Sequence, residues 1–290
     1  MPELVIRTSA PPPLSEHLAP VRLAGTLWRH RELIRNFAGR ELLERHKGAL
    51  LGIGWNVASP LLALGVYTLV FGYIFGQRWE RGNLPPHLDF PITYFAGAAL
   101  YAVFAEAMAR GPTLVSGRPN LVRKVVFPLE ILPVTAVYAA VIHALVSIGV
   151  LMLVLAAATA GRGLHWTVAL LPVVMLPLVL LAVGVAWFLS ALGVFLRDLR
   201  PITVVLTQLL MFCTPLFYSL DRIPADKPWL RRVIEHNPLS VIVESGRRVL
   251  LWGETPDWSR LGWTTLGALL VALGGHAVFS MLRRSMADVH

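Results

Sequence analysis

Six long apolar runs dominate the pattern of hydrophobic and polar residues along the chain. A helix crosses the hydrocarbon core of a bilayer with roughly 20 mainly apolar residues, and each run is close to that length or longer. The runs predict helices at Leu50–Phe75, Ile92–Met108, Ile131–Ala158, Val168–Phe195, Thr203–Ser219 and Trp263–Leu282. More apolar residues follow the fifth run, so its end is the least sharply defined boundary. We therefore expect an all-α polytopic membrane protein with six transmembrane helices.

The composition excludes a soluble globular protein. Of the 290 residues, 56% are hydrophobic and only 15% are charged, whereas a soluble domain carries about 25% charged residues. The single cysteine, Cys213, also excludes an intramolecular disulfide framework and a multi-cysteine metal site.

The positive charges are sorted by loop. Sixteen Lys and Arg residues lie before the first run, between the second and third, between the fourth and fifth, and after the sixth. The opposite short loops contain only Arg78, Arg81 and Arg162. Because cytoplasmic loops are enriched in cations, we expect both termini in the cytosol and the chain in the cytoplasmic (inner) membrane. Charge sorted in this way argues against nucleic acid as a partner, although the net charge is +9.

The segment before the first run divides into two parts. Residues 1–25 are rich in proline and lack the apolar core of a signal peptide, so we expect a flexible cytosolic tail. Residues 26–47 place apolar and basic side chains on opposite sides of a helix, which predicts an amphipathic interface helix. This helix could anchor the chain at the membrane surface, or it could be a gate whose Arg35, Arg40, Arg45 or Lys47 meets an anionic substrate group.

A long segment between the fifth and sixth runs, residues 221–258, contains two amphipathic pieces. They are Trp229–Glu235 and Leu239–Leu251, and four prolines surround them. We expect two short external helices. They either dip back towards the membrane or form a cap that only packs on the external surface.

The cytosolic loop 109–130 is interrupted by glycine and proline, and Leu121, Val122, Val125 and Phe127 give it an apolar edge. Exposed apolar residues in the cytosol need a partner surface to cover them. The alternative is that the loop packs on its own helix ends.

Motifs for enzymatic chemistry are missing. The sequence has no G-x-x-x-x-G-K-[ST] phosphate loop and none of the usual zinc-hydrolase, serine-hydrolase or EF-hand patterns. His143 lies deep in a span, where it could relay protons or hydrogen-bond to another helix. Glu106 and Arg110 are four residues apart and can form an ion pair. Because the sequence has no phosphate loop for ATP, transport by this chain would draw its energy from another chain.

Several ordered motifs resemble the permease subunits of type-2 ABC exporters of polysaccharides, which include O-antigen and teichoic acid exporters. The run Gly48–Pro60 resembles the opening of that domain, and Asn120–Pro128 resembles its first cytosolic loop. Phe195–Leu199, Thr214–Tyr218 and Asn237–Leu239 are similar to its C-terminal half. Together these motifs cover about residues 30 to 255 in the family's order.

The resemblance implies a homodimer of six-helix subunits, each with its transmembrane domain at residues 48–290, and a pathway between the two copies. It implies a separate ATPase subunit that carries ATP and Mg, with no cofactor on this chain and lipid-linked polysaccharide as the substrate. The external helices would be gate helices, and spans one and five would border the pathway. A coupling helix in loop 109–130 would dock into the ATPase through Gly117, Asn120, Leu121, Arg123, Lys124 and Phe127.

A polysaccharide pathway should offer aromatic faces to sugar rings. The candidates on spans one and five are Trp55, Tyr67, Phe71, Phe212, Phe217 and Tyr218, although aromatic residues also gather at membrane interfaces whatever the substrate. The diphosphate of a lipid-linked polymer suits bidentate contact with arginine, which favours Arg35, Arg40 and Arg45 as head-group contacts.

Three other functions compete with polysaccharide export. A type-2 ABC permease for a small drug or lipid would share most of these features. A membrane-embedded transferase of lipid-linked sugars would need a cluster of catalytic carboxylates or histidines, and the sequence offers none that is convincing. A structural membrane subunit would lack a transport pathway.

Overall fold

The computed structural model describes residues 20–44, 49–79, 81, 84–118, 128–224 and 226–289, and every regular element among them is helical. The long helices are α4 (Trp55–Tyr67) with its π-helical extension η2 (Thr68–Ile74), α5 (Pro86–Arg110), α7 (Ile131–Thr159), α8 (Leu171–Leu192), α9 (Leu199–Cys213) and α12 (Trp258–Val289). The shorter helices are α2 (Pro20–Arg29), α3 (Arg31–Glu44), η1 (Gly52–Gly54), η3 (Gly111–Thr113), η4 (Trp166–Leu170), η5 (Leu220–Arg222), α10 (Pro228–Glu235), α11 (Pro238–Arg247) and η6 (Arg248–Trp252).

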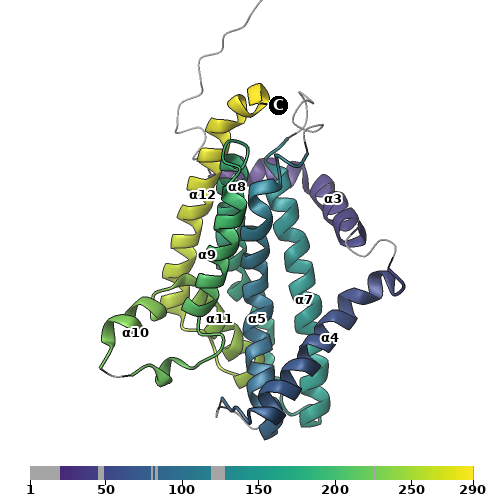
Figure 1. Ribbon diagram of the computed structural model, residues 1–290, viewed down its shortest axis with the longest axis vertical. Coiled ribbons are helices and arrows are strands. Elements are labelled where there is room, and N and C mark those ends of the chain that lie inside the picture. Colours follow the sequence, from purple (N-terminus) through teal and green to yellow (C-terminus); the bar gives the residue numbers. More distant parts are fainter. Residues whose placement is uncertain are drawn as a thin grey trace, which may run out of the picture.

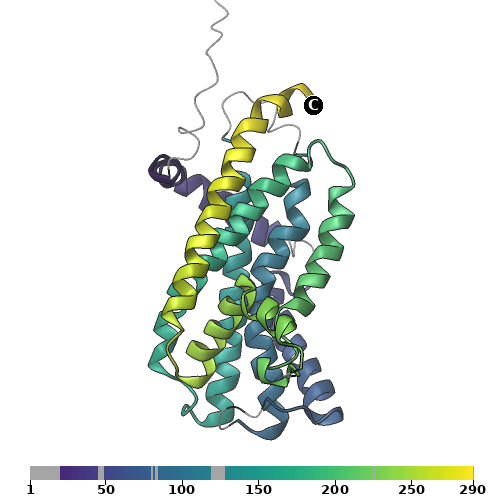
Figure 2. The same ribbon diagram turned by 90° about the vertical axis from the view of Figure 1, so that its left-hand side faces the viewer.

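Helices α5, α7, α8 and α12 run along the long axis of the molecule and enclose its core (Figures 1 and 2). Leu100, Leu151, Trp187 and Phe279 are buried there, one from each of these four helices. Helices α8 and α12 approach each other closely. A Cβ atom on Gly275 would lie 2.1 Å from the carbonyl oxygen of Gly184, so the small residue lets the two backbones touch.

Five segments are long and apolar enough to cross a membrane: Trp55–Ile74, Pro86–Thr113, Ile131–Thr159, Trp166–Leu192 and Trp258–Arg283. The all-α prediction is therefore confirmed for the described residues, and five of the predicted spans have a counterpart within a few residues. The predicted fifth span, Thr203–Ser219, is wrong at its end, because helix α9 stops at Cys213.

The early end of α9 has a local cause. Thr214 adopts an extended conformation, with φ −103° and ψ 133°, and it precedes Pro215, whose ring disfavours the helical conformation at the residue before it. With 15 residues, α9 is about 22 Å long at 1.5 Å per residue. That is shorter than the roughly 30 Å hydrocarbon core.

The predicted amphipathic helix over residues 26–47 is divided in two at His30, between α2 and α3. Helix α3 packs on α7 and buries Ile34 and Ala38, two of the apolar residues that define the predicted apolar face. Arg35 and Arg40 are exposed. Arg45 lies outside the described residues.

Both predicted external pieces are helical, but they occupy different environments. Helix α11 contacts α5, α8 and α12, and its Leu239, Ile242 and Val243 are almost fully buried. It therefore lies within the bundle, in the half away from the C-terminus (Figures 1 and 2). Helix α10 stays at the surface, where Trp229 and Val233 are exposed.

The contact between α8 and α12 generates a first prediction. Gly275→Leu should destabilise the protein by about 1–3 kcal/mol or more, because the new side chain meets the α8 backbone, and should lower the midpoint of thermal unfolding in detergent. Gly274→Leu is the matched control, since a Cβ atom at Gly274 meets nothing within 4 Å. Equal midpoints for the two variants would contradict this packing.

Candidate functional site

Tyr94 of α5 lies at the centre of an aromatic strip that connects η2 and α4 with the end of α9. We define the aromatic strip as Tyr67, Phe71, Phe90, Tyr94, Phe212 and Phe217. The centroid of the Tyr94 ring lies 4.7 Å from that of Tyr67 and 4.9 Å from that of Phe217. Phe71 lies 5.2 Å from Phe90, and Phe212 lies 5.9 Å from Phe217. Rings from three distant parts of the sequence therefore form one continuous cluster, in which Phe90 and Tyr94 are buried and Phe212 is exposed.

Four of the six predicted pathway residues come together in this strip: Tyr67, Phe71, Phe212 and Phe217. Trp55 does not, because it lies twelve residues before Tyr67 on α4, about 18 Å away along the helix axis. Tyr218 has a different contact, in which its hydroxyl donates to the carbonyl oxygen of Phe212 at 2.9 Å.

The local backbone explains how the strip is assembled. A Cβ atom on Gly72 would lie only 2.0 Å from the carbonyl oxygen of His87, so glycine lets η2 meet the start of α5. The neighbouring Phe71 is thereby placed against Phe90. The Thr68 hydroxyl donates to the carbonyl of Leu64 at 2.8 Å, where the helix changes from α to π geometry.

Arg247 of α11 holds the other side of the strip. Its side chain is fully buried and donates to three backbone carbonyls: Thr93 at 3.0 Å, Pro215 at 2.7 Å and Leu216 at 3.0 Å. Its guanidinium carbon also lies 4.4 Å from the centroid of the Trp79 ring. An arginine that reaches several acceptors at once is well suited to such a position, because its planar fork offers five N–H donors.

The three carbonyls determine where two rings of the strip lie. Thr93 directly precedes Tyr94, and Leu216 directly precedes Phe217. The guanidinium therefore joins the backbone of α5 to the segment after α9 beside the contact between these two rings. The carboxylate of Glu244 lies 3.8 Å from Arg247 and supplies a nearby counter-charge.

Three carbonyls in the last turn of α9 also have donors. These are Thr214 Oγ1 for Leu210, the Tyr218 hydroxyl for Phe212 and Asn237 Nδ2 for Cys213, at 2.8 to 3.1 Å. Asn237 also accepts from the N–H of Leu239 and so caps α11. The motifs Thr214–Tyr218 and Asn237–Leu239, which are distant in the sequence, thus meet at the point where α9 ends.

A cavity of about 220 Å³ lies between α4, α5 and α7, next to Tyr67. Its walls are made mainly of small side chains such as Ser59, Ala98 and Ala102, and His143 of α7 also lines it. His143 therefore lies beside one end of the aromatic strip.

At the end of the bundle near the C-terminus, ion pairs join separate elements. The predicted pair between Glu106 and Arg110 is present at 3.1 Å. Arg110 also pairs with Glu41 of α3, and Arg118 lies 3.8 Å from the same carboxylate. Gly117 lies beside Arg118, whereas the other predicted coupling residues, Asn120, Leu121, Arg123, Lys124 and Phe127, lie outside the described residues.

Sequence reasoning missed Tyr94, Arg247 and Glu41. Arg247 was one of several cations in the long predicted segment 221–258. The sequence feature that could have singled it out is its position in a mainly apolar helix that follows a span ended by a proline. The described residues contain no group of three or more His, Cys, Asp or Glu side chains that could hold a metal ion. The candidate site is the cluster of aromatic rings, which Arg247 joins through backbone carbonyls.

The comparison with known families agrees with this architecture. The model of the ABC-2 type transporter family matches residues 32–251. The chain belongs to this family. The match confirms the resemblance that the ordered motifs carry, and it covers the aromatic strip, Arg247 and most of α3.

Individual relatives resemble the chain over almost its whole length. An O-antigen export system permease protein RfbA of Myxococcus xanthus is 29% identical over 268 residues, which cover 92% of this chain and 99% of the relative. A protein of the same name from Klebsiella pneumoniae is 26% identical over 258 residues, covering 89% and 95% of the two chains.

The contacts of Arg247 generate a second prediction. Arg247→Met should remove the donors of three buried carbonyls and destabilise the protein by about 3 kcal/mol or more, so the midpoint of thermal unfolding in detergent should fall clearly. Arg231→Met is the control, because Arg231 is half-exposed and pairs with Glu235 of the same surface helix, α10. The assignment is wrong if Arg247→Met unfolds at the same temperature as the control.

Proposed function

We propose that this chain is the transmembrane permease subunit of an ATP-driven exporter that moves a lipid-linked polysaccharide across the cytoplasmic membrane. The observation that carries the proposal is the similarity to the RfbA permeases over nearly their entire length. The aromatic strip supports it, because sugar rings pack their apolar faces on aromatic side chains.

Two copies of the chain would enclose the pathway. Helices α4 and α9 flank α5 on one face of the bundle (Figure 1), and both leave large apolar side chains exposed. On α4 and η2 these include Leu62, Val66 and Leu69, and on α9 they include Val205, Leu209 and Phe212. A second copy placed against this face covers these side chains, and the aromatic strip then borders the space between the two copies.

The energy would come from ATP and Mg on a separate ATPase subunit that docks on residues 117–127. Ion pairs lie at both ends of this docking region. Arg118, near its start, lies 3.8 Å from Glu41 of α3, and Glu130, just after its end, lies 2.9 Å from Arg283 of α12. These ion pairs would transmit a movement of the docked loop to α3, which precedes the loop in the sequence, and to α12, which follows it.

With the ATPase docked on residues 117–127 from the cytosol, both termini would also lie in the cytosol, and α2 and α3 would lie at the cytosolic surface of the membrane. Arg35, Arg40 and Arg45 would there contact the diphosphate of the lipid carrier, because guanidinium groups bind phosphate oxygens in a bidentate manner. Helices α10 and α11 would then form the external gate region 221–258.

The aromatic strip generates a third prediction. Tyr94→Leu keeps an aliphatic side chain at this position but removes the ring that connects Tyr67 with Phe217. We expect export of the polymer to the cell surface to fall about tenfold, as for the loss of about 1.4 kcal/mol of binding, in cells where the variant replaces the wild type. The measurement is surface polysaccharide relative to permease in the membrane.

Tyr138→Leu is the control for this experiment, since Tyr138 is an exposed aromatic residue of α7. A normal surface signal from Tyr94→Leu at equal permease levels would remove the strip from the pathway. Failure of the wild-type chain to restore surface polysaccharide in a permease-deficient cell would favour a small drug or lipid as the substrate.

The docking region generates a fourth prediction. Phe127→Asp should place a charge in the apolar edge of the docking loop, and burying that charge against the ATPase is costly. We expect ATP hydrolysis by the purified complex to continue or fall while export is lost, whereas Phe127→Leu should retain both. Unchanged export by Phe127→Asp would exclude this loop as the coupling element.

A further inference from the structure

A loop borders the end of the aromatic strip that lies farthest from the C-terminus. Its described residues are 77–79 and 81, and it leads from η2 towards α5 at the lower end of the bundle in Figure 1. The ring of Trp79 lies 5.9 Å from that of Phe90. Phe90 and its neighbour Phe71 are thus the last rings of the strip before the loop.

Two arginine–tryptophan pairs join this loop to α11 and η6. The guanidinium carbon of Arg247 lies 4.4 Å from the centre of the Trp79 ring in the loop. In the second pair the roles are exchanged, because Arg81 belongs to the loop and lies 4.4 Å from the Trp252 ring of η6. A guanidinium over an aromatic ring is attracted by the negative face of that ring. Arg81 also forms an ion pair with Glu244 of α11, at 3.2 Å.

Two hydrogen bonds hold the loop from other sides. The backbone N–H of Trp79 donates to the Asp89 carboxylate of α5 at 2.8 Å, and Asp89 is buried. Arg222 of η5 donates to the carbonyl oxygen of Arg78 at 3.1 Å. The loop is therefore a point at which α5, η5, α11 and η6 are joined.

The attachment of the loop is easily reversed on its outer side. The side chain of Arg81 is 45% exposed and that of Glu244 is 25% exposed, and an ion pair that water reaches contributes little stability. At the η2 end of the loop, Gly76 has a φ of 58°, and a Cβ atom there would meet nothing within 4 Å. Glycine adopts this left-handed conformation readily, so the chain can turn at Gly76 with open space around it.

The elements on the two sides of this attachment differ in how firmly they are packed. On α4 and η2 the buried residues are Pro60, Leu64 and Gly72. Helix α11, in contrast, lies within the bundle, and its Ile242 and Val243 are almost fully buried. The loop and α11 would therefore separate by a movement of the loop, since few contacts hold the helix to which it is attached.

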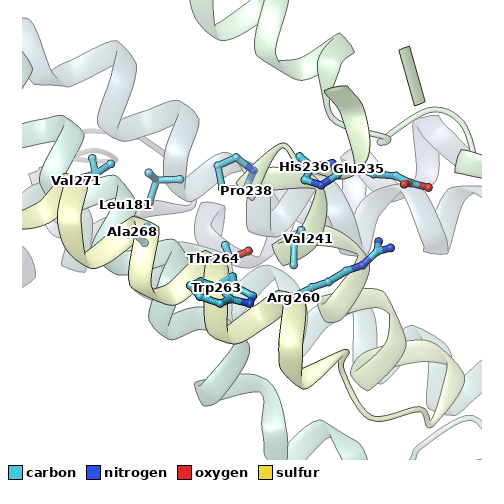
Figure 3. Close-up of a pocket in the computed structure, with 11 residues that line it drawn as sticks. Leu181, Glu235, His236, Pro238, Val241, Arg260, Trp263, Thr264, Ala268 and Val271 are labelled. Atoms are coloured by element: carbon cyan, nitrogen blue, oxygen red, sulfur yellow. The ribbon is translucent and has the colours of Figure 1, made fainter. Parts of the chain in front are cut away.

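The opposite side of α11 faces a cavity instead of a loop. This cavity, of about 470 Å³, lies between α11 and the first half of α12, with Pro238 and Val241 on one side and Trp263 and Thr264 on the other (Figure 3). It defines the alternative movement, in which α11 itself would shift towards α12. Holding one side of α11 at a time distinguishes the two movements.

We propose that residues 77–81 are an external clasp, which closes the outer end of the aromatic strip and opens during each transport cycle while α11 keeps its place beside α12. The proposal rests on the proposed export function. A polymer that leaves along the strip passes Phe71 and Phe90 last and then meets the loop, where Trp79 lies against α11. Opening breaks the ion pair of Arg81 and both arginine–tryptophan contacts, and it leaves the hydrogen bonds of Arg247 to the backbone intact.

The first test measures the clasp without reference to the exported substrate. The full chain is purified with its ATPase in lipid nanodiscs and carries two spin labels, at Arg81→Cys and Glu244→Cys. The control pair is Val241→Cys and Thr264→Cys across the cavity, and both chains also carry Cys213→Ala. During hydrolysis of ATP with Mg, the 81–244 distance should gain a longer population, and the 241–264 distance should stay constant. A constant 81–244 distance overturns the clasp, and so does a change in the 241–264 distance.

The second test joins each pair of cysteines in cells. A bifunctional thiosulfonate reagent links the two cysteines through disulfide bonds, and a reductant releases them. Linking 81 to 244 should reduce newly made surface polysaccharide to the level of permease-deficient cells, relative to the same variant treated with a monofunctional reagent, and the reductant should restore it. Linking 241 to 264 should leave export unchanged. Export by the linked 81–244 variant, or loss of export on linking 241 to 264, would contradict the proposal.

Together the two tests separate the clasp from the identity of the substrate. If the 81–244 distance lengthens with ATP but the wild-type chain restores no surface polysaccharide, the clasp stands and polysaccharide export is wrong. If the wild-type chain restores surface polysaccharide and the linked 81–244 variant does so too, export stands and the clasp is wrong.

Discussion

The end of helix α9 inside the bundle is the constraint on which the rest of the structure depends. A helix that stops within a membrane protein leaves carbonyl groups that no water can satisfy, so other parts of the protein must supply donors. Thr214, Tyr218 and Asn237 supply them in the last turn of α9. Arg247 supplies them for Pro215 and Leu216 in the segment that follows, and it also binds the carbonyl of Thr93. One side chain of α11 thereby joins α5 to the segment after α9, and the contact between Tyr94 and Phe217 follows from that connection.

Apolar periodicity and run length were sufficient to predict most of the fold, because a spanning helix must satisfy its own backbone and expose mainly apolar side chains. The same reasoning failed at the fifth span. Residues 214–219 carry no charge and include Leu216 and Phe217, but Pro215 breaks the helical conformation and Arg247 stabilises the extended chain. Hydropathy measures the side chains along the sequence, whereas this boundary depends on a hydrogen bond from a residue more than thirty positions away.

The aromatic strip was predicted only in part for a related reason. Tyr67, Phe71 and Phe217 stood out because they lie on the spans that the family resemblance places beside the pathway. Tyr94 lies on a helix that also carries Phe90, Phe95 and Phe104, and nothing in the sequence distinguishes its ring from theirs. The rotation of α5 about its axis decides which of these rings meets the neighbouring helices. Packing and the hydrogen bond from Arg247 to the carbonyl of Thr93 fix that rotation.

Helix α5 connects the two ends of the molecule. Near its start, the carbonyl of Thr93 is held by Arg247, and at its end Arg110 pairs with Glu41 of α3. These two residues are 17 positions apart, about 26 Å along the helix. Both ends of α5 are thus joined to other elements, to α11 at one end and to α3 at the other. Helices α4 and α9 have little buried surface by comparison, and motion is least costly where few contacts must be broken. The architecture therefore separates a rigid element that can carry force from two lightly packed helices that can respond to it.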